Sequence, residues 1–219
     1  MARWTRSDLV LFGAYIKAGW QVMRAAILMR ATLKKKVVTI FGGAQVKGDD
    51  TYHSQAFEIA KQLAEQEYSI LTGGGPGVME AANCGADAGE RKTKSTANLG
   101  IGVAGVDEDF ENKCGSFIRV NQFFGRKWLL IRYSVAAIVF PGGIGTADEL
   151  FELLNALKHH QINHIPVILV GADFWQPLIN WYNNSLQTGY IAKENAHLLR
   201  VVDDTAEILK IITHATTKH

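Results

Sequence analysis

Three glycine-rich loops, each directly after a short apolar run, constrain the fold of this sequence more than any other feature. The apolar runs are 37–41, 68–72 and 136–140, and the glycines that follow lie within 42–43, 73–77 and 142–145. Uninterrupted apolar runs are typical of strands whose two faces are both covered by helices. Stretches with helical periodicity separate these runs, and such alternation predicts βαβ units. We therefore predict an α/β fold: a doubly wound, Rossmann-like parallel sheet with helices on both faces.

The remaining elements extend the same pattern to the end of the chain. Further strands are expected at 99–104, 166–170 and 198–202, and helices at 51–66, from about 78, at 121–133, after 146 and after Asp203. Because no Pro/Gly/Ser-rich linker divides the chain, residues 37–219 are expected to form one domain, preceded by an N-terminal segment at 1–36.

The N-terminal segment differs chemically from the body. The whole chain has a net charge of only +2, which does not point to nucleic acid, but residues 1–36 hold eight Lys/Arg and one acid. Wound as a helix, Lys17, Gln21 and Arg24 share one wedge, and an apolar stripe lies elsewhere, formed by Leu9, Phe12, Ile16, Trp20, Met23 and Ile27. We predict an amphipathic helix that packs on its own domain or on a second subunit. Contact of this helix with an anionic membrane surface, or with nucleic acid, is a less favoured alternative. The charges disfavour a membrane span or a signal peptide.

Two cysteines, Cys84 and Cys114, are too few for a disulfide framework. Free thiols are the default in a reducing compartment, so the sequence favours a cytoplasmic protein.

The glycine loops predict a binding site for an anion. In an open parallel sheet, ligands bind beyond the carboxyl ends of the strands, and glycine lets the backbone N–H groups approach a phosphate closely. Any one loop could be a simple turn, but three together favour a phosphate-bearing ligand held by Gly43, Gly73, Gly74, Gly75, Gly142, Gly143 and Gly145. Since no loop matches the P-loop or the Gly-x-Gly-x-x-Gly pattern, ATP hydrolysis and NAD chemistry are disfavoured.

Several polar residues near these loops allow two interpretations each. Thr146 and Glu149 fit a capping box at a helix start, and Glu149 could equally act on a bound ligand. Arg126 and Lys127 could bind an anion or form a solvated basic pair. His160 and His164 have helical spacing but no evident third ligand, so no metal site is predicted.

Three segments give the sequence a family resemblance: GGGPGVMEAANCGA at 73–86, FFGRK at 123–127 and PGGIGTADELFELL at 141–154. In this order and spacing they resemble the Lonely Guy (LOG) family over roughly residues 37–202, a family long labelled lysine decarboxylase. The resemblance implies a phosphoribohydrolase that cleaves the N-glycosidic bond of a nucleoside 5′-monophosphate, AMP-like or a cytokinin ribotide, to free base and ribose 5-phosphate. It further implies no cofactor and a homodimer or larger assembly with the site near the subunit interface.

The same resemblance assigns roles to individual residues. Arg126 and Glu149 match the catalytic pair, and Glu80 matches a glutamate of the bacterial form of the first motif. Gly142, Gly143, Gly145 and Thr146 match the phosphate cradle, and Lys127 is expected beside the substrate. Residues 105–120 depart from the family pattern. The alternative is a non-catalytic protein of the same fold that binds a nucleotide or molybdenum cofactor. The decarboxylase label lacks support, because it requires a Schiff-base lysine with pyridoxal phosphate.

Overall fold

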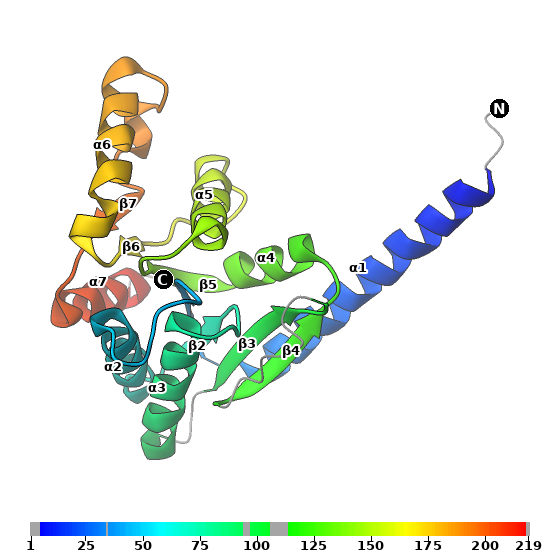
Figure 1. The fold of residues 1–219 in the computed structure, drawn as a ribbon, viewed down its shortest axis with the longest axis horizontal. Helices are drawn as coiled ribbons and strands as arrows, with labels where there is room; N and C mark the ends of the chain where they lie inside the picture. Colours follow the sequence, from blue (N-terminus) through cyan, green and yellow to red (C-terminus); the bar gives the residue numbers. More distant parts are fainter. Residues whose placement is uncertain (1–4, 34, 94–96, 106–113, 218–219) are drawn as a thin grey trace.

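The computed structural model confirms the doubly wound α/β fold (Figure 1). It describes residues 5–33, 35–93, 97–105 and 114–217, except the side chains of residues 6, 9 and 10. Within this part of the chain, seven strands form one sheet in the order β4-β3-β2-β1-β5-β6-β7, and every neighbouring pair is parallel. The strands are β1 (Val37–Phe41), β2 (Ser69–Thr72), β3 (Asn98–Val103), β4 (Ser116–Val120), β5 (Ser134–Val139), β6 (Val167–Leu169) and β7 (Leu199–Val201).

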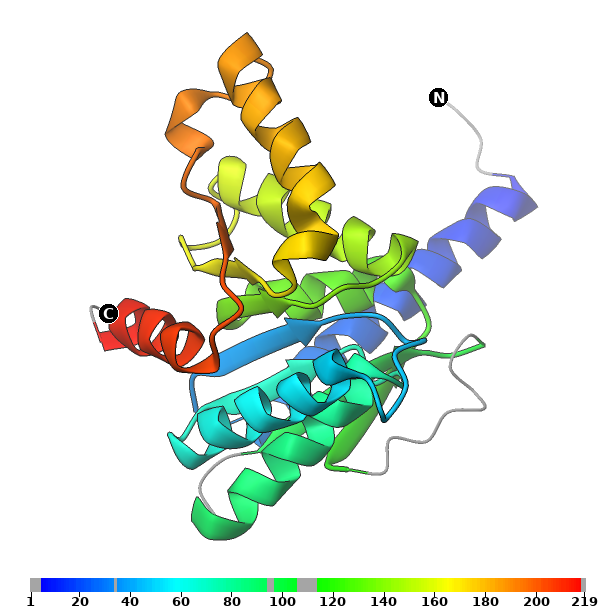
Figure 2. The same ribbon diagram turned by 60° about the vertical axis from the view of Figure 1, so that its left-hand side comes forward.

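Helices cover both faces of the sheet (Figure 2). Residues of α2 (Thr51–Glu65), α3 (Val78–Thr93) and α7 (Thr205–Thr217) are buried against one face. The other face is covered by α1 (Arg6–Thr32), α4 (Phe123–Arg132), α5 (Ile144–Lys158) and α6 (Ala172–Thr188). A short 3-10 helix, η1 (Lys193–Asn195), precedes β7.

The two-sided cover explains why the strands are apolar without interruption. Along β1, Val38 and Ile40 belong to the core under α2, α3 and α7, whereas Val37 and Phe41 belong to the opposite core. Successive side chains of a strand point to opposite faces, so both sets are buried only when helices lie on both sides. Thr39 is the polar exception, and its hydroxyl donates a hydrogen bond to the Leu130 carbonyl at 2.9 Å.

The N-terminal helix forms as predicted, but a different side of it contacts the body. Ala25 and Met29, with Leu33 at the helix end, are buried in the core of the second face. The predicted apolar stripe is exposed at Phe12, Ile16, Trp20, Met23 and Ile27. The helix thus packs on its own domain, as one of the two predicted alternatives has it, but these five stripe residues take no part in that contact, and the side chain of Leu9 lies outside the described part. None of the described helices is long and apolar enough to cross a membrane.

The expectation of free thiols is also wrong, because Cys84 and Cys114 form a disulfide. Cys84 lies on α3 and Cys114 stands two residues before β4, with 4.9 Å between their Cα atoms. Thirty residues of sequence separate them, and only the parallel crossover from α3 through β3 brings them together. The sequence argument for a reducing compartment rested on free thiols, and the disulfide removes that support.

Candidate active site

A cavity opens where the order of the strands reverses. The chain proceeds from β1 to β2 on one side and from β5 to β6 on the other, so the loops after the neighbouring strands β1 and β5 diverge. Such a switch point is where open α/β sheets bind ligands. The Gly43 N–H donates to the Pro141 carbonyl at 2.9 Å and joins the two loops at the cavity floor. The cavity has a volume of about 640 Å³ and is lined by Gly42, Gly43, Ala44, Gln45, Val46, Asp50, Tyr52, Met79, Arg126, Pro141, Gly142, Gly143, Gly145, Thr146, Glu149 and Phe174.

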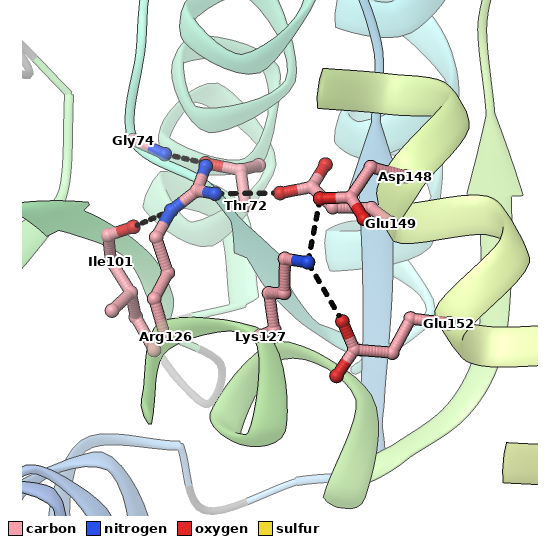
Figure 3. A network of polar contacts seen from close by, with 8 residues as sticks. All are labelled: Thr72, Gly74, Ile101, Arg126, Lys127, Asp148, Glu149 and Glu152. Carbon is pink, nitrogen blue, oxygen red and sulfur yellow. Dashed lines mark hydrogen bonds and ion pairs between the residues drawn. The ribbon is translucent and has the colours of Figure 1, made fainter. Parts of the chain in front are cut away.

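A buried ion pair between Arg126 and Glu149 forms one wall of the cavity (Figure 3). Arg126 extends from α4 and donates to Glu149 Oε1 at 2.7 Å through Nη1, and to the Ile101 carbonyl at 2.9 Å through Nε. The two side chains are only 14% and 8% exposed. Because both bonds fix the guanidinium plane, the pair is held rigidly at the carboxyl ends of β3 and β5.

Burial and Arg126 have opposite effects on the pKa of Glu149. Loss of water around the carboxyl group raises the pKa of Glu149, and the charge and hydrogen bond of Arg126 lower it. Burial is the larger cause, so the pKa stays above the ordinary value for a glutamate. Asp148 adds a smaller rise through its like charge. Arg126 is therefore the main group that favours the ionised form of Glu149 against the effect of burial.

Lys127 is engaged with carboxylates instead of facing the cavity. Its Nζ lies 2.6 Å from Asp148 and 3.0 Å from Glu152, and Figure 3 shows these two residues approaching it from α5. The bond to Asp148 is the main cause that raises the pKa of Lys127. The side chain therefore ties α4 to α5 and remains charged. Lys127 is not among the residues that line the cavity.

The capping-box interpretation of Thr146 and Glu149 is wrong. The helix α5 begins at Ile144 with Gly143 as its N-cap, so Thr146 is the third helical residue and Glu149 bonds to Arg126 instead of folding back. Gly142 must be a glycine, because a Cβ there would lie 2.3 Å from Thr146 Oγ1. Gly142, Gly143, Gly145 and Thr146 all line the cavity at the first turn of α5, where backbone N–H groups have no partner within the helix.

The second glycine loop supports the site without lining it. Gly73, Gly74 and Gly75 are absent from the cavity wall, and the Gly74 N–H donates to Thr72 Oγ1 at 3.0 Å. A Cβ on Gly73 would lie 2.0 Å from Nη2 of Arg126, so this glycine makes room for the guanidinium. Glu80, in the first turn of α3, is likewise not among the lining residues.

The opposite wall carries residues that no motif marked. Asp50, Tyr52 and Phe174 line the cavity from the start of α2 and from α6. Asp50 is the N-cap of α2 and accepts the Tyr52 N–H at 2.7 Å. Burial, followed by the charges of Asp203, Asp173 and Asp50, raises the pKa of Tyr52. An Asp before a helical stretch was the only sequence signal here, and it marks a cap, not a site.

Comparison with known proteins gives the relatives of the chain. A family model described as "possible lysine decarboxylase" matches residues 70–212, which is more than half of the chain. The pyrimidine/purine nucleotide 5′-monophosphate nucleosidase of Escherichia coli K12 is 27% identical over 203 residues, which cover 87% of this chain. The chain spans less than half of that relative, since the match covers 43% of its length. The cytokinin riboside 5′-monophosphate phosphoribohydrolase LOG2 of Arabidopsis thaliana is 24% identical over 184 residues, which cover 83% of this chain and 84% of that protein.

Solved structures agree on the architecture. The molybdenum cofactor binding protein from Rippkaea orientalis superimposes with a TM-score of 0.62 at 21% identity, covering 83% of this chain and 98% of that one. The Moco carrier protein from Chlamydomonas reinhardtii gives 0.57 at 23% identity, covering 84% and 99%. Identities this low show a shared fold alone. Taken with the family match and the glycine and Arg-Lys motifs, they establish that this chain is a Rossmann-like member of the LOG family, the family described as "possible lysine decarboxylase".

Proposed function

We propose that the chain hydrolyses the N-glycosidic bond of a nucleoside 5′-monophosphate, either AMP-like or a cytokinin ribotide. The buried Arg126–Glu149 pair at the wall of the switch-point cavity is the observation that carries this proposal. A carboxylate beside a phosphate cradle repels a bound phosphate, which weakens simple binding. A role of this carboxylate in catalysis explains why it is present there. The names of the E. coli and Arabidopsis relatives support the same reaction class.

Different residues would bind the nucleotide and cleave its N-glycosidic bond. The first turn of α5, at Gly142, Gly143, Gly145 and Thr146, would bind the 5′-phosphate and thereby fix the ribose. The C–N bond then breaks, the base leaves with the electron pair, and the ribose becomes oxocarbenium-like. The Glu149 carboxylate would stabilise this cation and accept a proton from the water that adds to the anomeric carbon. The departing base takes up one proton at the nitrogen that was bonded to the ribose, and Glu149 gives up the proton that it took from water, so the carboxylate is regenerated. The products are free base and ribose 5-phosphate.

Arg126 supports this chemistry through Glu149. Without a cation nearby, the buried carboxyl group would take up a proton at higher pH and could neither stabilise a cation nor accept a proton. Arg126 is thus a positioning and charge-balancing residue for Glu149, with its own guanidinium exposed to the cavity on one side.

Lysine decarboxylation finds no support in this site. A Schiff base requires a neutral lysine amine, and the pKa of Lys127 is raised by its bonds to Asp148 and Glu152. None of the described residues that line the cavity is a lysine.

The substitution Glu149→Gln tests the proposal. We expect hydrolysis of AMP, followed as released ribose 5-phosphate, to fall by about 10²–10⁴-fold, because the stabilising charge is lost while the amide keeps the shape. Nucleotide binding should persist. The matched control is Asp148→Asn, which removes the neighbouring exposed carboxylate and should retain most of the activity. Full activity in Glu149→Gln would refute the catalytic role.

The alternative of a non-catalytic carrier makes a different prediction. Ligands that copurify with the protein can be identified by mass spectrometry of the denatured sample. A bound pterin, together with no hydrolysis of any nucleoside monophosphate, would favour the carrier. We propose the hydrolase because a carrier has no need of a buried carboxyl group that is paired with an arginine at the cavity wall.

We also propose that the chain assembles as a homodimer or a larger homo-oligomer. Phe12, Ile16, Trp20, Met23 and Ile27 form an exposed apolar stripe on α1, and exposed patches of this kind mark interaction surfaces. Phe123, Phe124 and Trp128 are exposed on α4, the helix that carries Arg126. A second subunit on α4 would stand close to the site.

A further inference from the structure

A second cavity lies against β7, the edge strand at the opposite side of the sheet from β4. Its volume is about 840 Å³, and three parts of the chain form its walls. His164 and Pro166 come from the segment before β6, His197 and Arg200 from the segment around β7, and a single stripe of α7 supplies Ala206, Glu207, Lys210, Ile211, His214 and Ala215. We call this cavity the basic groove. It shares no lining residue with the candidate active site.

Two of the three charged side chains that line the basic groove are cations. They are Arg200 and Lys210, against one carboxylate, Glu207, and three histidines also line the groove, His164, His197 and His214. Within the described part of the chain, the side chains of Arg200 and Lys210 make no ion pair or hydrogen bond. Two cations from different elements thus line a space that holds one acid.

Two histidines of the groove stack on each other, and Arg200 acts on one of them. The rings of His164 and His197 stack with centroids 4.8 Å apart and planes 25° apart. Burial first, and then the positive charges of His197 and Arg200, lower the pKa of His164. A neighbouring cation disfavours protonation of an imidazole, so the lowered pKa agrees with a cation close to His164.

A metal ion does not fit this group. Among the residues that the structure describes, no three His, Cys, Asp or Glu side chains are placed to hold one. Arginine and lysine, moreover, are donors only, and they bind anions. An arginine fork binds phosphate oxygens in bidentate fashion, and a lysine binds a second phosphate as a point charge.

We propose that the basic groove binds a small anion that carries at least two phosphate groups, with Arg200 holding one group and Lys210 the other. The three histidines would add hydrogen-bond donors around the same anion when protonated. The apolar residues Pro166, Ala206, Ile211 and Ala215 leave the groove room for a non-phosphate part of such a ligand. This site is separate from the proposed hydrolase site, since the two cavities open on different elements.

His164 makes the site sensitive to bound anions. His164, His197 and His214 face the same space as Arg200, Lys210 and Glu207, and these six are its titratable groups. Burial and neighbouring cations lower the pKa of His164. A bound anion favours the charged imidazole, so anion binding should raise the pKa of His164.

Inorganic pyrophosphate is the probe that tests the site on the full chain. Isothermal titration calorimetry gives the affinity, and the imidazole proton signals in NMR spectra report where the probe binds. We expect the signals of His164, His197 and His214 to shift on binding, while His53 on α2, which lines neither cavity, stays unchanged. The double variant Arg200→Gln/Lys210→Gln should weaken this binding by at least about tenfold.

The matched control is Lys17→Gln/Arg24→Gln, which removes the same two charge types from the exposed surface of α1. This control should bind pyrophosphate as the parent does, and both double variants should keep the parent's unfolding temperature. Equal weakening in the two variants would mean that only net charge matters, and it would overturn the proposal. So would pyrophosphate binding without a shift of the three histidine signals, since that result places the probe outside the basic groove. AMP hydrolysis should be unaffected in the groove variant, so this test is independent of the proposed function.

Discussion

At the scale of single residues, the site depends on one guanidinium that contacts two partners. Arg126 bonds to the Ile101 carbonyl and to Glu149, and a glycine at 73 leaves the space that it occupies. The arginine is therefore both placed by the backbone and required by the carboxylate. The contacts of Arg126 therefore have an electrostatic and a steric consequence.

The electrostatic prediction concerns the ionisation of Glu149. Burial raises its pKa and Arg126 partly offsets the rise, so Arg126→Gln should raise the pKa of Glu149 further. A carboxylate is lost as the pH falls through its pKa, so the acid limb of activity should lie above the ordinary glutamate value of about 4.3 and move higher in the variant. Carbon-13 NMR of the Glu149 carboxyl group measures this without requiring turnover. Arg132→Gln, on the same helix but at its exposed end, is the control. An unchanged Glu149 pKa in Arg126→Gln would contradict the assigned coupling.

Gly73 and Gly75 belong to one loop, but we expect substitution of each by alanine to have different effects on activity. A Cβ at position 73 would lie 2.0 Å from Arg126 Nη2, so Gly73→Ala should displace the guanidinium and lower kcat by about 10–100-fold. At position 75 the Cβ would meet only the flexible end of Met79, at 2.7 Å, so Gly75→Ala should have a much smaller effect. Steady-state kinetics with AMP compare the two. If both variants lost equal activity, the loop would be acting as a unit and not through Arg126.

At the scale of elements, apolar continuity predicted the central strands correctly. The strands β1, β2, β3 and β5 are buried on both faces, and hydrophobicity alone marks such strands. The strand β4 was not predicted, because an edge strand with an exposed Ser116 and Arg119 carries no such run. The helix α6 was not predicted either, and it holds Pro177 within its first turns.

The site was predictable only in part, for a related reason. The first turn of α5 and the Arg126–Glu149 pair sit in contiguous motifs, so sequence can point to them. Tyr52 and Phe174 reach the cavity from elements far apart in the chain, and only the tertiary fold makes them neighbours. Gly73 to Gly75 carried the pattern of an anion loop, yet the structure uses Gly73 for packing.

The disulfide between α3 and the start of β4 gives an element-scale prediction. A cross-link over 30 residues removes freedom from the unfolded chain, so reduction should lower the free energy of unfolding by about 3–4 kcal/mol. Urea unfolding with and without reductant measures this change. The double variant Cys84→Ser/Cys114→Ser is the control, and its stability should not respond to reductant. Two reactive thiols in denatured protein that was never reduced would contradict the cross-link.

The exposed stripe on α1 gives a prediction about assembly. Removing residues 1–33 would also remove Met29 and Leu33 from the core, so substitution is the better test. Ile16→Glu/Trp20→Glu alters only exposed side chains and should lower the oligomeric state in sedimentation without unfolding the chain. Lys17→Glu, on the adjacent wedge, should have no such effect. Unchanged sedimentation of the double variant, with flotation of the parent on anionic vesicles, would instead favour membrane contact.

At the scale of the whole molecule, the two cavities occupy different parts of one sheet. The candidate active site lies between β1 and β5, and the basic groove lies against the edge strand β7. Only β6 and the elements packed on it separate them along the strand order. The architecture therefore allows both ligands to be bound at once.

The Arg126–Glu149 pair also comes from other parts of the chain than three further residues that line the active-site cavity. The Arg126–Glu149 pair is fixed by α4 and α5, whereas Asp50, Tyr52 and Phe174 belong to segments that hold neither of these residues. Redesign of substrate choice can therefore begin at 44–52 and at Phe174, leaving the reactive pair in place.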